Sequence, residues 1–335
     1  DLGQTVSEKT TDQLLAAYKN GSATAAEQRQ LEVMLFQYGR YLTISSSRED
    51  SQLPSNLQGV WNCLNNPPWS SDYHMNVNLQ MNYWPAETGN CSDTVKPLVH
   101  FMKMLSRFGE QTAHDEFGAR GWCINHTTDV FGRTGVHDSV DCGFFPMAGP
   151  WMCLNLWEHY EFTADRDYLR EIYPVLVGSC RFLLDYLCEA PEGYLTTSPS
   201  NSPENCFYYT EPDGSRRGSM LTHGATIDFE IIYALFTRTA YACGLLGDTA
   251  FADELKAACD GLNLAEICIV SSVSWETAPE GAEVAQGVNF PALTIGVSEA
   301  KGEKCPRCWM HSEAANAEGL CPRCAAVIAK LDVEI

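Results

Sequence analysis

The sequence predicts a mainly α-helical protein with a small β-containing, zinc-ribbon-like module at its C-terminal end. Two observations carry this prediction. Between residues 24 and 259, apolar side chains recur at helical spacing in segments separated by long polar and aromatic loops. Beyond residue 264, β-branched runs and two Cys-x-x-Cys pairs replace that pattern. We therefore expect two domains, at residues 1–260 and 261–335.

The helical part begins with a segment at residues 24–45, where Thr24 and Glu27 have the form of a capping box. Residues 46–73 are a long loop rich in Ser, Asn and Pro. Two helices follow, one short and one amphipathic, at residues 78–87 and 95–113. Loops of this length inside a compact domain tend to be functional.

The next loop, at residues 118–143, carries His126 and Asp129. A buried helix is expected at 147–162, and a helix at 168–187 is expected to break in two at Pro174. A third long loop is expected at residues 194–224. The last two predicted helices follow it, at residues 226–246 and 249–259. Strand candidates then appear at residues 267–273 and 293–297.

Composition excludes some partners. The 335 residues are 45% hydrophobic and carry a net charge of −21, with a pI near 4.6. Phosphate binding needs clustered Lys and Arg, so nucleic acid is not expected to be the partner of the whole chain. From residue 301 to the end the charges balance.

Cysteine usage and hydropathy bear on location. Eleven of the 15 cysteines are scattered, often among apolar residues, which favours reduced thiols in a cytoplasmic protein over a disulfide framework. No signal peptide opens the chain, and no apolar run approaches the roughly 20 residues that span a bilayer, so no membrane partner is expected. The first residue is Asp1 rather than Met, which leaves room for an upstream segment.

The remaining four cysteines form two Cys-Pro-Arg-Cys pairs separated by 12 residues, Cys305 with Cys308 and Cys321 with Cys324. Four thiolates on two tight turns are the usual supply for a tetrahedral Zn²⁺ site. We therefore predict one structural zinc ion. A redox disulfide is the alternative.

The segment from His74 to Glu87 is dense in amides and aromatic rings. Asn76 and Asn78 are two residues apart, so in an extended stretch both amides would face one side and could hold a water molecule. The alternative is that these amides satisfy loop backbone. Trp84 is more often a core residue than a sugar platform at such a position.

Glu204 lies in the third loop, within Ser198-Pro-Ser-Asn-Ser-Pro-Glu204. A Glu in a rigid, desolvated loop can serve as a general acid, because desolvation raises the pKa of a carboxyl group. The alternative for Glu204 is a solvated loop carboxylate.

Five motifs, in order along residues 10–260, together resemble glycoside hydrolase family 95, which contains α-1,2-L-fucosidases. They are Leu53-Pro-Ser-Asn-Leu-Gln-Gly-Val-Trp-Asn62, Asn76-x-Asn78-x-x-Met-Asn-Tyr-Trp-Pro-Ala-Glu87, Gly121-Trp-Cys-Ile-Asn-His-Thr-Thr-Asp129, Leu156-Trp-Glu-His-Tyr-Glu-Phe162 and Ser202-Pro-Glu-Asn205. The resemblance implies part of an (α/α)6 toroid of helical hairpins, an inverting hydrolysis, and a fucosylated oligosaccharide as substrate.

By the same resemblance, Glu204 matches the general acid, and Asn76 with Asn78 match the amides that orient the attacking water. His74, His126, Asp129 and Trp84 are candidates for contacts with the sugar. Inversion also needs a second carboxylate roughly 6.5–9.5 Å from the acid. In the family it stands in a motif resembling Gln-Ile-Asp-Gly-Asn, which this sequence lacks. Hydrolysis by the chain as it stands is therefore expected to be very weak.

The C-terminal part resembles the end of bacterial isoleucyl-tRNA synthetases. The residues that carry this are Leu264-Ala-Glu-Ile-Cys-Ile-Val-Ser271, Ala300-Lys-Gly-Glu-Lys-Cys-Pro-Arg-Cys-Trp309 and Leu320-Cys-Pro-Arg-Cys324. The resemblance implies a zinc module with possible tRNA contact. No motif of an ATP-binding synthetase core is present in the sequence.

The leading interpretation is a truncated fucosidase-type hydrolase fused to this module. The alternatives are a tRNA-contacting zinc module and a non-catalytic carbohydrate-binding remnant. We also expect helix 226–246 to expose an apolar face.

Overall fold

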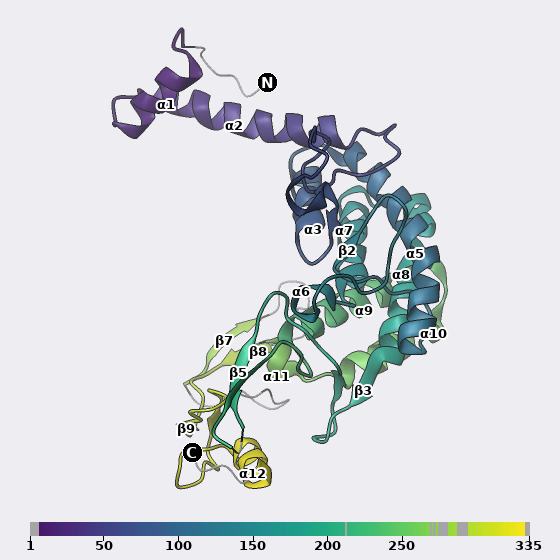
Figure 1. Cartoon of the computed structure of the whole chain (residues 1–335), viewed down its shortest axis with the longest axis vertical. Helices are drawn as coiled ribbons and strands as arrows, with labels where there is room; N and C mark the ends of the chain where they lie inside the picture. The colour runs from purple at the N-terminus through teal and green to yellow at the C-terminus, as the bar shows by residue number, and fades with distance from the viewer. Residues whose placement is uncertain are drawn as a thin grey trace. The chain divides into compact units, whose positions relative to one another are not determined.

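The computed structural model describes residues 7–211, 213–268, 270, 273, 281–286 and 294–331 (Figure 1). The chain forms two compact units. The first comprises residues 1–187 and 234–259, and the second comprises residues 188–233 and 260–335. The long helix α9 (Thr226–Leu246) continues from the second unit into the first. The predicted domain boundary at residue 260 stays a prediction.

The first unit is helical, as the sequence predicts. Its helices are α1 (Thr11–Lys19), α2 (Ala25–Ser46), α3 (Asn78–Tyr83), α4 (Pro85–Thr88), α5 (Lys96–Phe117), α6 (Val140–Gly143), α7 (Ala148–Thr163), α8 (Arg166–Tyr186) and α10 (Thr249–Asp260). Two 3₁₀ turns accompany them, η1 (Pro68–Ser71) and η2 (Ser92–Val95). Strands β1 (Tyr73–His74) and β2 (Thr127–Thr128) form a short antiparallel pair.

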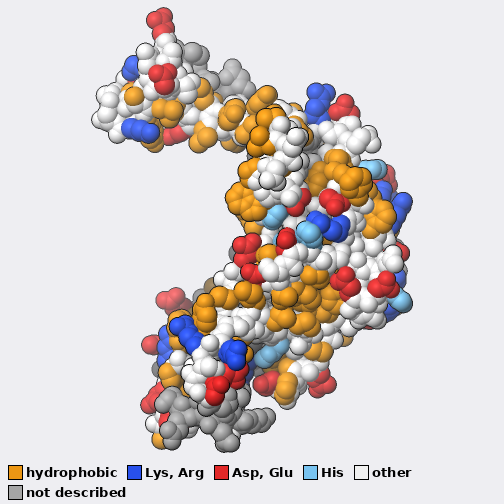
Figure 2. All heavy atoms as spheres, in the orientation of Figure 1, with side chains coloured by type: hydrophobic (Ala, Val, Ile, Leu, Met, Phe, Trp, Pro, Cys, Tyr) orange, Lys and Arg blue, Asp and Glu red, His pale blue; other side chains and the backbone are white. Residues whose placement is uncertain are grey.

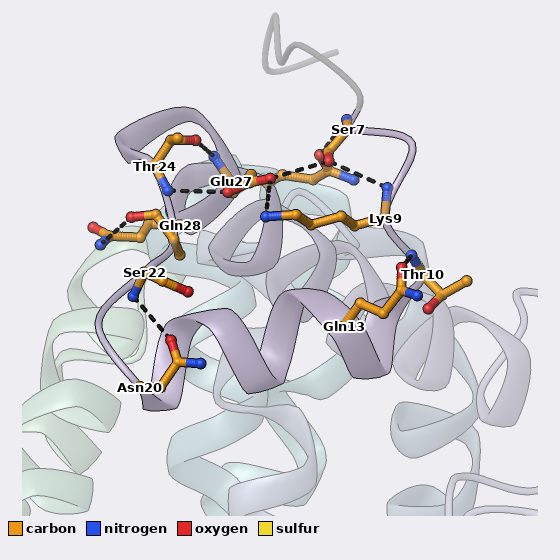
Figure 3. A network of polar contacts seen from close by, with 11 residues as sticks. Ser7, Lys9, Thr10, Gln13, Asn20, Ser22, Thr24, Glu27 and Gln28 are labelled. Carbon is orange, nitrogen blue, oxygen red and sulfur yellow. Dashed lines mark hydrogen bonds and ion pairs between the residues drawn. The ribbon is translucent and has the colours of Figure 1, made fainter.

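Helix α2 starts at the predicted capping box (Figure 3). The Glu27 amide donates to Thr24 Oγ1 at 3.3 Å, and the Thr24 amide donates to Glu27 Oε2 at 3.0 Å. Lys9 reaches back from before α1 to Glu27 Oε1 at 2.8 Å, which ties α1 to the start of α2. Hydrogen bonding to Lys9 and to the Thr24 backbone lowers the pKa of Glu27 to about 2.

Helices α5, α7 and α8 pack around Trp122, whose indole N–H donates to the Val175 carbonyl at 2.9 Å. The chain before it requires a glycine. Gly121 has a φ of +67°, and a Cβ there would lie 1.9 Å from the Gly178 carbonyl oxygen. Any side chain at this position would therefore separate the loop from α8.

The expected break at Pro174 is wrong, because α8 runs unbroken from Arg166 to Tyr186 with Pro174 inside it. Proline removes one helical hydrogen bond, but buried packing holds the helix on both sides of that position. Ile172 and Val175 are buried. In addition, the Tyr173 hydroxyl donates to Asp248 Oδ2 at 2.9 Å.

The second unit holds more strand than the sequence predicts. Its strands are β3 (Leu187–Glu189), β4 (Leu195–Thr197), β5 (Phe207–Thr210), β6 (Arg216–Ser219), β7 (Glu283–Gln286), β8 (Thr294–Val297), β9 (Glu303–Lys304) and β10 (His311–Ser312). The described part of this unit also contains α11 (Leu264–Ile267), α12 (Pro322–Leu331) and the start of α9. The expected loop at 194–224 thus contains the antiparallel hairpin β5–β6, whose paired residues are exposed on both faces and lack an apolar alternation.

Of the two strands predicted near residues 270 and 295, the structure contains only the second among its described residues. Strand β8 confirms the second, and it pairs with β7. Ile267 instead ends the short helix α11, and the described residues 268, 270 and 273 are not in a strand. Residues 269, 271 and 272 of the predicted strand lie outside the described residues.

The expected exposed apolar face of α9 is largely covered: Ile231, Ile232, Leu235 and Phe236 are buried, and Leu245 is half-buried. Exposed apolar side chains lie along α2 instead (Figure 2). They are 43–74% exposed and comprise Leu35, Phe36, Tyr38, Tyr41 and Ile44. Of the eleven scattered cysteines, six are buried and four are exposed. Among the described residues, no helix is both long and apolar enough to cross a bilayer.

Candidate functional site

The β1–β2 pair brings two of the predicted sugar-contacting residues together. His74 pairs with Thr127 across the ladder, and the Met75 amide donates to the His126 carbonyl at 2.5 Å. The His74 and His126 rings lie edge to face with centroids 5.7 Å apart. His74 Nδ1 lies 2.5 Å from Asp72 Oδ1, which fixes the orientation of the His74 ring and leaves its Nε2 for another partner.

Burial sets the charge state of His126, which is only 2% exposed. Burial lowers the pKa of His126, and the neighbouring His74 lowers it further. Asp138, whose Oδ2 lies 4.0 Å from His126 Nε2, and Asp72 oppose this shift without reversing it. His126 is therefore a neutral imidazole near pH 7, able to both donate and accept hydrogen bonds.

The structure separates the two asparagines. Asn76 is 8% exposed, whereas Asn78 is exposed as the first residue of α3. The chain between them is not extended, since Val77 has φ −179° and ψ −32°. The two amides therefore do not share one side of a strand. Trp84, between α3 and α4, is 46% exposed, so it is not a core residue, and its predicted contact with the sugar stays a prediction.

Buried polar atoms gather around β1–β2 without protein partners. Three buried atoms have no hydrogen-bond partner among the described residues: Asn76 Oδ1, His126 Nδ1 and Thr128 Oγ1. A buried polar atom without a partner costs about 1–3 kcal/mol. These atoms come from the two segments that the β1–β2 ladder brings together. They indicate a place where a polar molecule, such as a sugar or ordered water, completes the hydrogen bonding.

Asp129 is engaged in its own turn. Its Oδ1 accepts from the Phe131 amide at 2.9 Å, and its Oδ2 lies 3.9 Å from Arg133 Nε. These contacts give Asp129 a role in shaping the loop beside His126. Asp138 is exposed and lies between His126 and His137.

Glu204 is exposed in a turn of the second unit, where the Asn205 amide donates to the Ser202 carbonyl at 2.8 Å. The asparagines belong to the first unit. The expected convergence of Glu204 with Asn76 and Asn78 therefore stays a prediction.

Asp228 anchors the segment that leads to Glu204, and the sequence reading missed it. Its Oδ2 accepts from Thr197 Oγ1 at 2.7 Å and from Ser200 Oγ at 2.8 Å. Ser200 also pairs with Thr222 through two backbone hydrogen bonds of 2.8 Å. The signal in the sequence was an aspartate flanked by Ile227 and Phe229 in an otherwise apolar helix, where a carboxylate is buried only with partners.

The Asp228 carboxyl is 2% exposed, and burial raises its pKa to about 6. The hydrogen bonds from Thr197 and Ser200 oppose that rise. Its second oxygen, Oδ1, has no hydrogen-bond partner among the described residues. The Asp228 carboxyl group therefore takes up a proton at a higher pH than an exposed aspartate does.

The zinc prediction concerns a compact cluster in the second unit. The four Sγ atoms of Cys305, Cys308, Cys321 and Cys324 all lie within 4.8 Å of one another. Hairpin β9–β10 carries the first pair, and the second pair stands at the start of α12. Tetrahedral Zn–S bonds of about 2.3 Å place sulfur atoms roughly 3.8 Å apart. The observed 3.6 Å between Cys308 Sγ and Cys321 Sγ fits that geometry.

The thiols also have the electrostatics of a cation site. Burial would raise the pKa of Cys305, but backbone amides at Cys308 and Cys321 outweigh it and lower the pKa to about 6. Burial and the three neighbouring sulfurs raise the pKa of Cys324. Four adjacent thiolates repel one another unless a cation lies between them, so the donor set fits Zn²⁺.

Comparison with known proteins defines the class of the helical part. The model of the glycosyl hydrolase family 95 catalytic domain matches residues 1–273, and the chain belongs to this family. Alpha-L-fucosidase 2 of Arabidopsis thaliana is 41% identical over 218 residues, which are 64% of this chain and 25% of that protein. A probable alpha-fucosidase A of Aspergillus niger is 36% identical over 204 residues, 59% of this chain and 25% of that protein.

The C-terminal part matches a second model, the zinc finger found in FPG and IleRS, at residues 302–327. An isoleucine–tRNA ligase of Desulfovibrio desulfuricans is 30% identical over 180 residues, 48% of this chain and 18% of that protein. The chain thus spans about a quarter of the length of the fucosidase relatives and less than a fifth of this synthetase.

Proposed function

We propose that the helical part is a fucosidase-type site that binds terminal α-1,2-linked L-fucose and hydrolyses it poorly. One observation carries the proposal: Asn76 Oδ1, His126 Nδ1 and Thr128 Oγ1 are buried without hydrogen-bond partners, and the His126 ring lies 5.7 Å from the His74 ring. A sugar supplies hydroxyl groups that both donate and accept, which matches this mixture of an amide oxygen, an imidazole and a hydroxyl. The relatives named as fucosidases suggest which sugar.

In the proposed reaction, Glu204 gives its proton to the glycosidic oxygen while a water molecule attacks the anomeric carbon from the opposite face. Asn76, whose buried Oδ1 has no hydrogen-bond partner, orients that water, and His74 and His126 hold the sugar. A base must then take the proton from the water. A positioned base contributes about 10²–10⁴-fold to such a reaction. Since the sequence lacks the family's aspartate motif, we expect hydrolysis to be slower by at least that factor.

The test is binding of L-fucose to the full chain, followed by saturation-transfer NMR. The Asn76→Ala variant should weaken the signal by about fivefold or more, because it removes a buried acceptor. The Asn62→Ala variant is the matched control, since Asn62 is an exposed loop amide. Equal signals from both variants would contradict the proposed site. Turnover of a fucosyl-α-1,2-hexoside at the rate of a complete family member would contradict the predicted weakness.

We also propose that the C-terminal module holds one structural zinc ion through its four cysteines and contacts RNA. The favouring observation is Trp309, which is 69% exposed, with Lys304 Nζ 5.2 Å from its ring centroid. An unpaired base can stack on the exposed aromatic ring while the neighbouring cation contacts the phosphate backbone. Trp309→Ala should weaken binding of a labelled tRNA anticodon stem-loop in 50 mM salt. Phe131→Ala, which removes an 85% exposed aromatic ring of the first unit, should not.

A further inference from the structure

The hairpin β5–β6 follows Glu204 directly and has two chemically different faces. Its register pairs Phe207 with Ser219 and Tyr209 with Arg217. Because side chains alternate along a strand, Phe207, Tyr209 and Arg217 share one face, which we call the aromatic face of the hairpin. Tyr208 and Arg216 lie on the opposite face.

The ring on the opposite face is already in use. The Arg216 guanidinium lies 4.3 Å from the centre of the Tyr208 ring, and Gly218 stands across from Tyr208 in the ladder. On the aromatic face, the Phe207 and Tyr209 rings lie 6.3 Å apart at 40° and are 45% and 43% exposed. Two neighbouring exposed aromatic rings beside an exposed guanidinium form an apolar patch with a polar edge. Exposed patches of this kind can serve as binding surfaces.

The chemistry of the aromatic face suits a pyranose. A sugar ring offers an apolar face of C–H groups and a rim of hydroxyls. Aromatic rings pack against the apolar C–H face, and a tyrosine hydroxyl lies at the solvent-exposed edge of such a contact. The guanidinium of Arg217 supplies donors to the hydroxyl rim. An apolar peptide would leave that guanidinium without a function, so the sugar fits better.

Position along the chain selects which sugar. Phe207 is three residues after Glu204, and an extended chain spans at most about 3.6 Å per residue, so their Cα atoms lie within roughly 11 Å. The hydrogen bond from the Asn205 amide to the Ser202 carbonyl turns the chain just there. A general acid lies within about 3.2 Å of the oxygen that it protonates. The sugar that keeps this oxygen, the leaving group, is therefore within reach of the aromatic face.

We propose that Phe207, Tyr209 and Arg217 bind the leaving-group sugar, the hexose whose 2-hydroxyl carries the fucose. This inference rests on the proposed function of Glu204 as the acid. It assigns recognition of the leaving group to residues of the second unit, separately from the fucose-binding residues around β1–β2.

The experiment measures saturation-transfer NMR of the full chain with methyl β-D-galactopyranoside as the probe, and separately with L-fucose. The double variant Phe207→Ala/Tyr209→Ala should weaken galactoside binding by about fivefold or more. Tyr208→Ala is the matched control on the opposite face and should bind the galactoside like the wild type. All three residues are exposed, so far-UV circular dichroism should be the same for each variant.

Three results would overturn the inference: no galactoside binding by the wild type, no loss in the double variant, or an equal loss in Tyr208→Ala. A shift of the double variant to a smaller species in gel filtration would also overturn it, because the hairpin would then be an interface between copies. Fucose is the separate arm. Wild-type protein that binds the galactoside but not L-fucose would refute the proposed fucose site and leave the aromatic face standing.

Discussion

Asp228 offers a quantitative test of how burial controls a carboxyl group beneath the Glu204 loop. The perturbation is Asp228→Asn, which keeps the shape and an acceptor oxygen for Thr197 and Ser200 but cannot ionise. Burial raises the pKa of Asp228 from 3.8 to about 6. One pKa unit is worth about 1.36 kcal/mol, so the shift of roughly two units corresponds to about 3 kcal/mol.

The sign follows from proton binding. Between about pH 4 and pH 6 the folded state holds a proton on Asp228 that the unfolded state has lost, so stability falls as the pH rises through this window. Above about pH 6 the full penalty applies. Asp228→Asn removes this dependence, so the variant should gain about 3 kcal/mol relative to the wild type between pH 4 and pH 7.5.

The assay is urea denaturation of both proteins at several pH values, followed by circular dichroism, with the two free energies of unfolding subtracted at each pH. The subtraction cancels the other titrating groups. Glu230→Gln is the matched control, because Glu230 is an exposed carboxylate on the same helix. Its difference curve should be flat. A flat curve for Asp228→Asn as well would refute the reasoning that burial dominates at this carboxyl.

Three further predictions concern other parts of the chain. Purified protein should contain one zinc per chain by elemental analysis, and Cys321→Ser should lower that content and unfold the C-terminal module while most of the helical circular dichroism signal persists. Thr24→Ala should destabilise the α1–α2 hairpin by about 1 kcal/mol in urea melts. The stability that Glu27 contributes there should be present above about pH 4.5 and be lost as the pH falls toward about 2, since its pKa is lowered. The exposed side chains of α2 should promote association, so light scattering should report a smaller average mass for Leu35→Gln/Tyr38→Gln than for the wild type; equal masses would show that α2 makes no intermolecular contact.

Local signals in the sequence determined the helical elements and the cluster of four cysteines. Three such signals are the capping box of Thr24 and Glu27, the apolar spacing of α5 and the doubled Cys-x-x-Cys pairs. Each depends on residues that are close together in the sequence, so the residue pattern alone predicts the structure. Motif order along the chain likewise pointed to the family that the comparison then showed. The unbroken α8 escaped the sequence reading, because packing on both sides of Pro174 overrides the local cost of proline.

Only the tertiary structure decided the environment of the candidate site. No spacing rule states that Asn76 is buried and Asn78 exposed, since that difference comes from the start of α3 between them. Nor does it state that His74 and His126, 52 positions apart, meet across β1–β2, or that Asp228 lies under Thr197 and Ser200. Burial and pKa depend on which distant segments exclude water from a group, and a linear sequence records residue types without recording those neighbours.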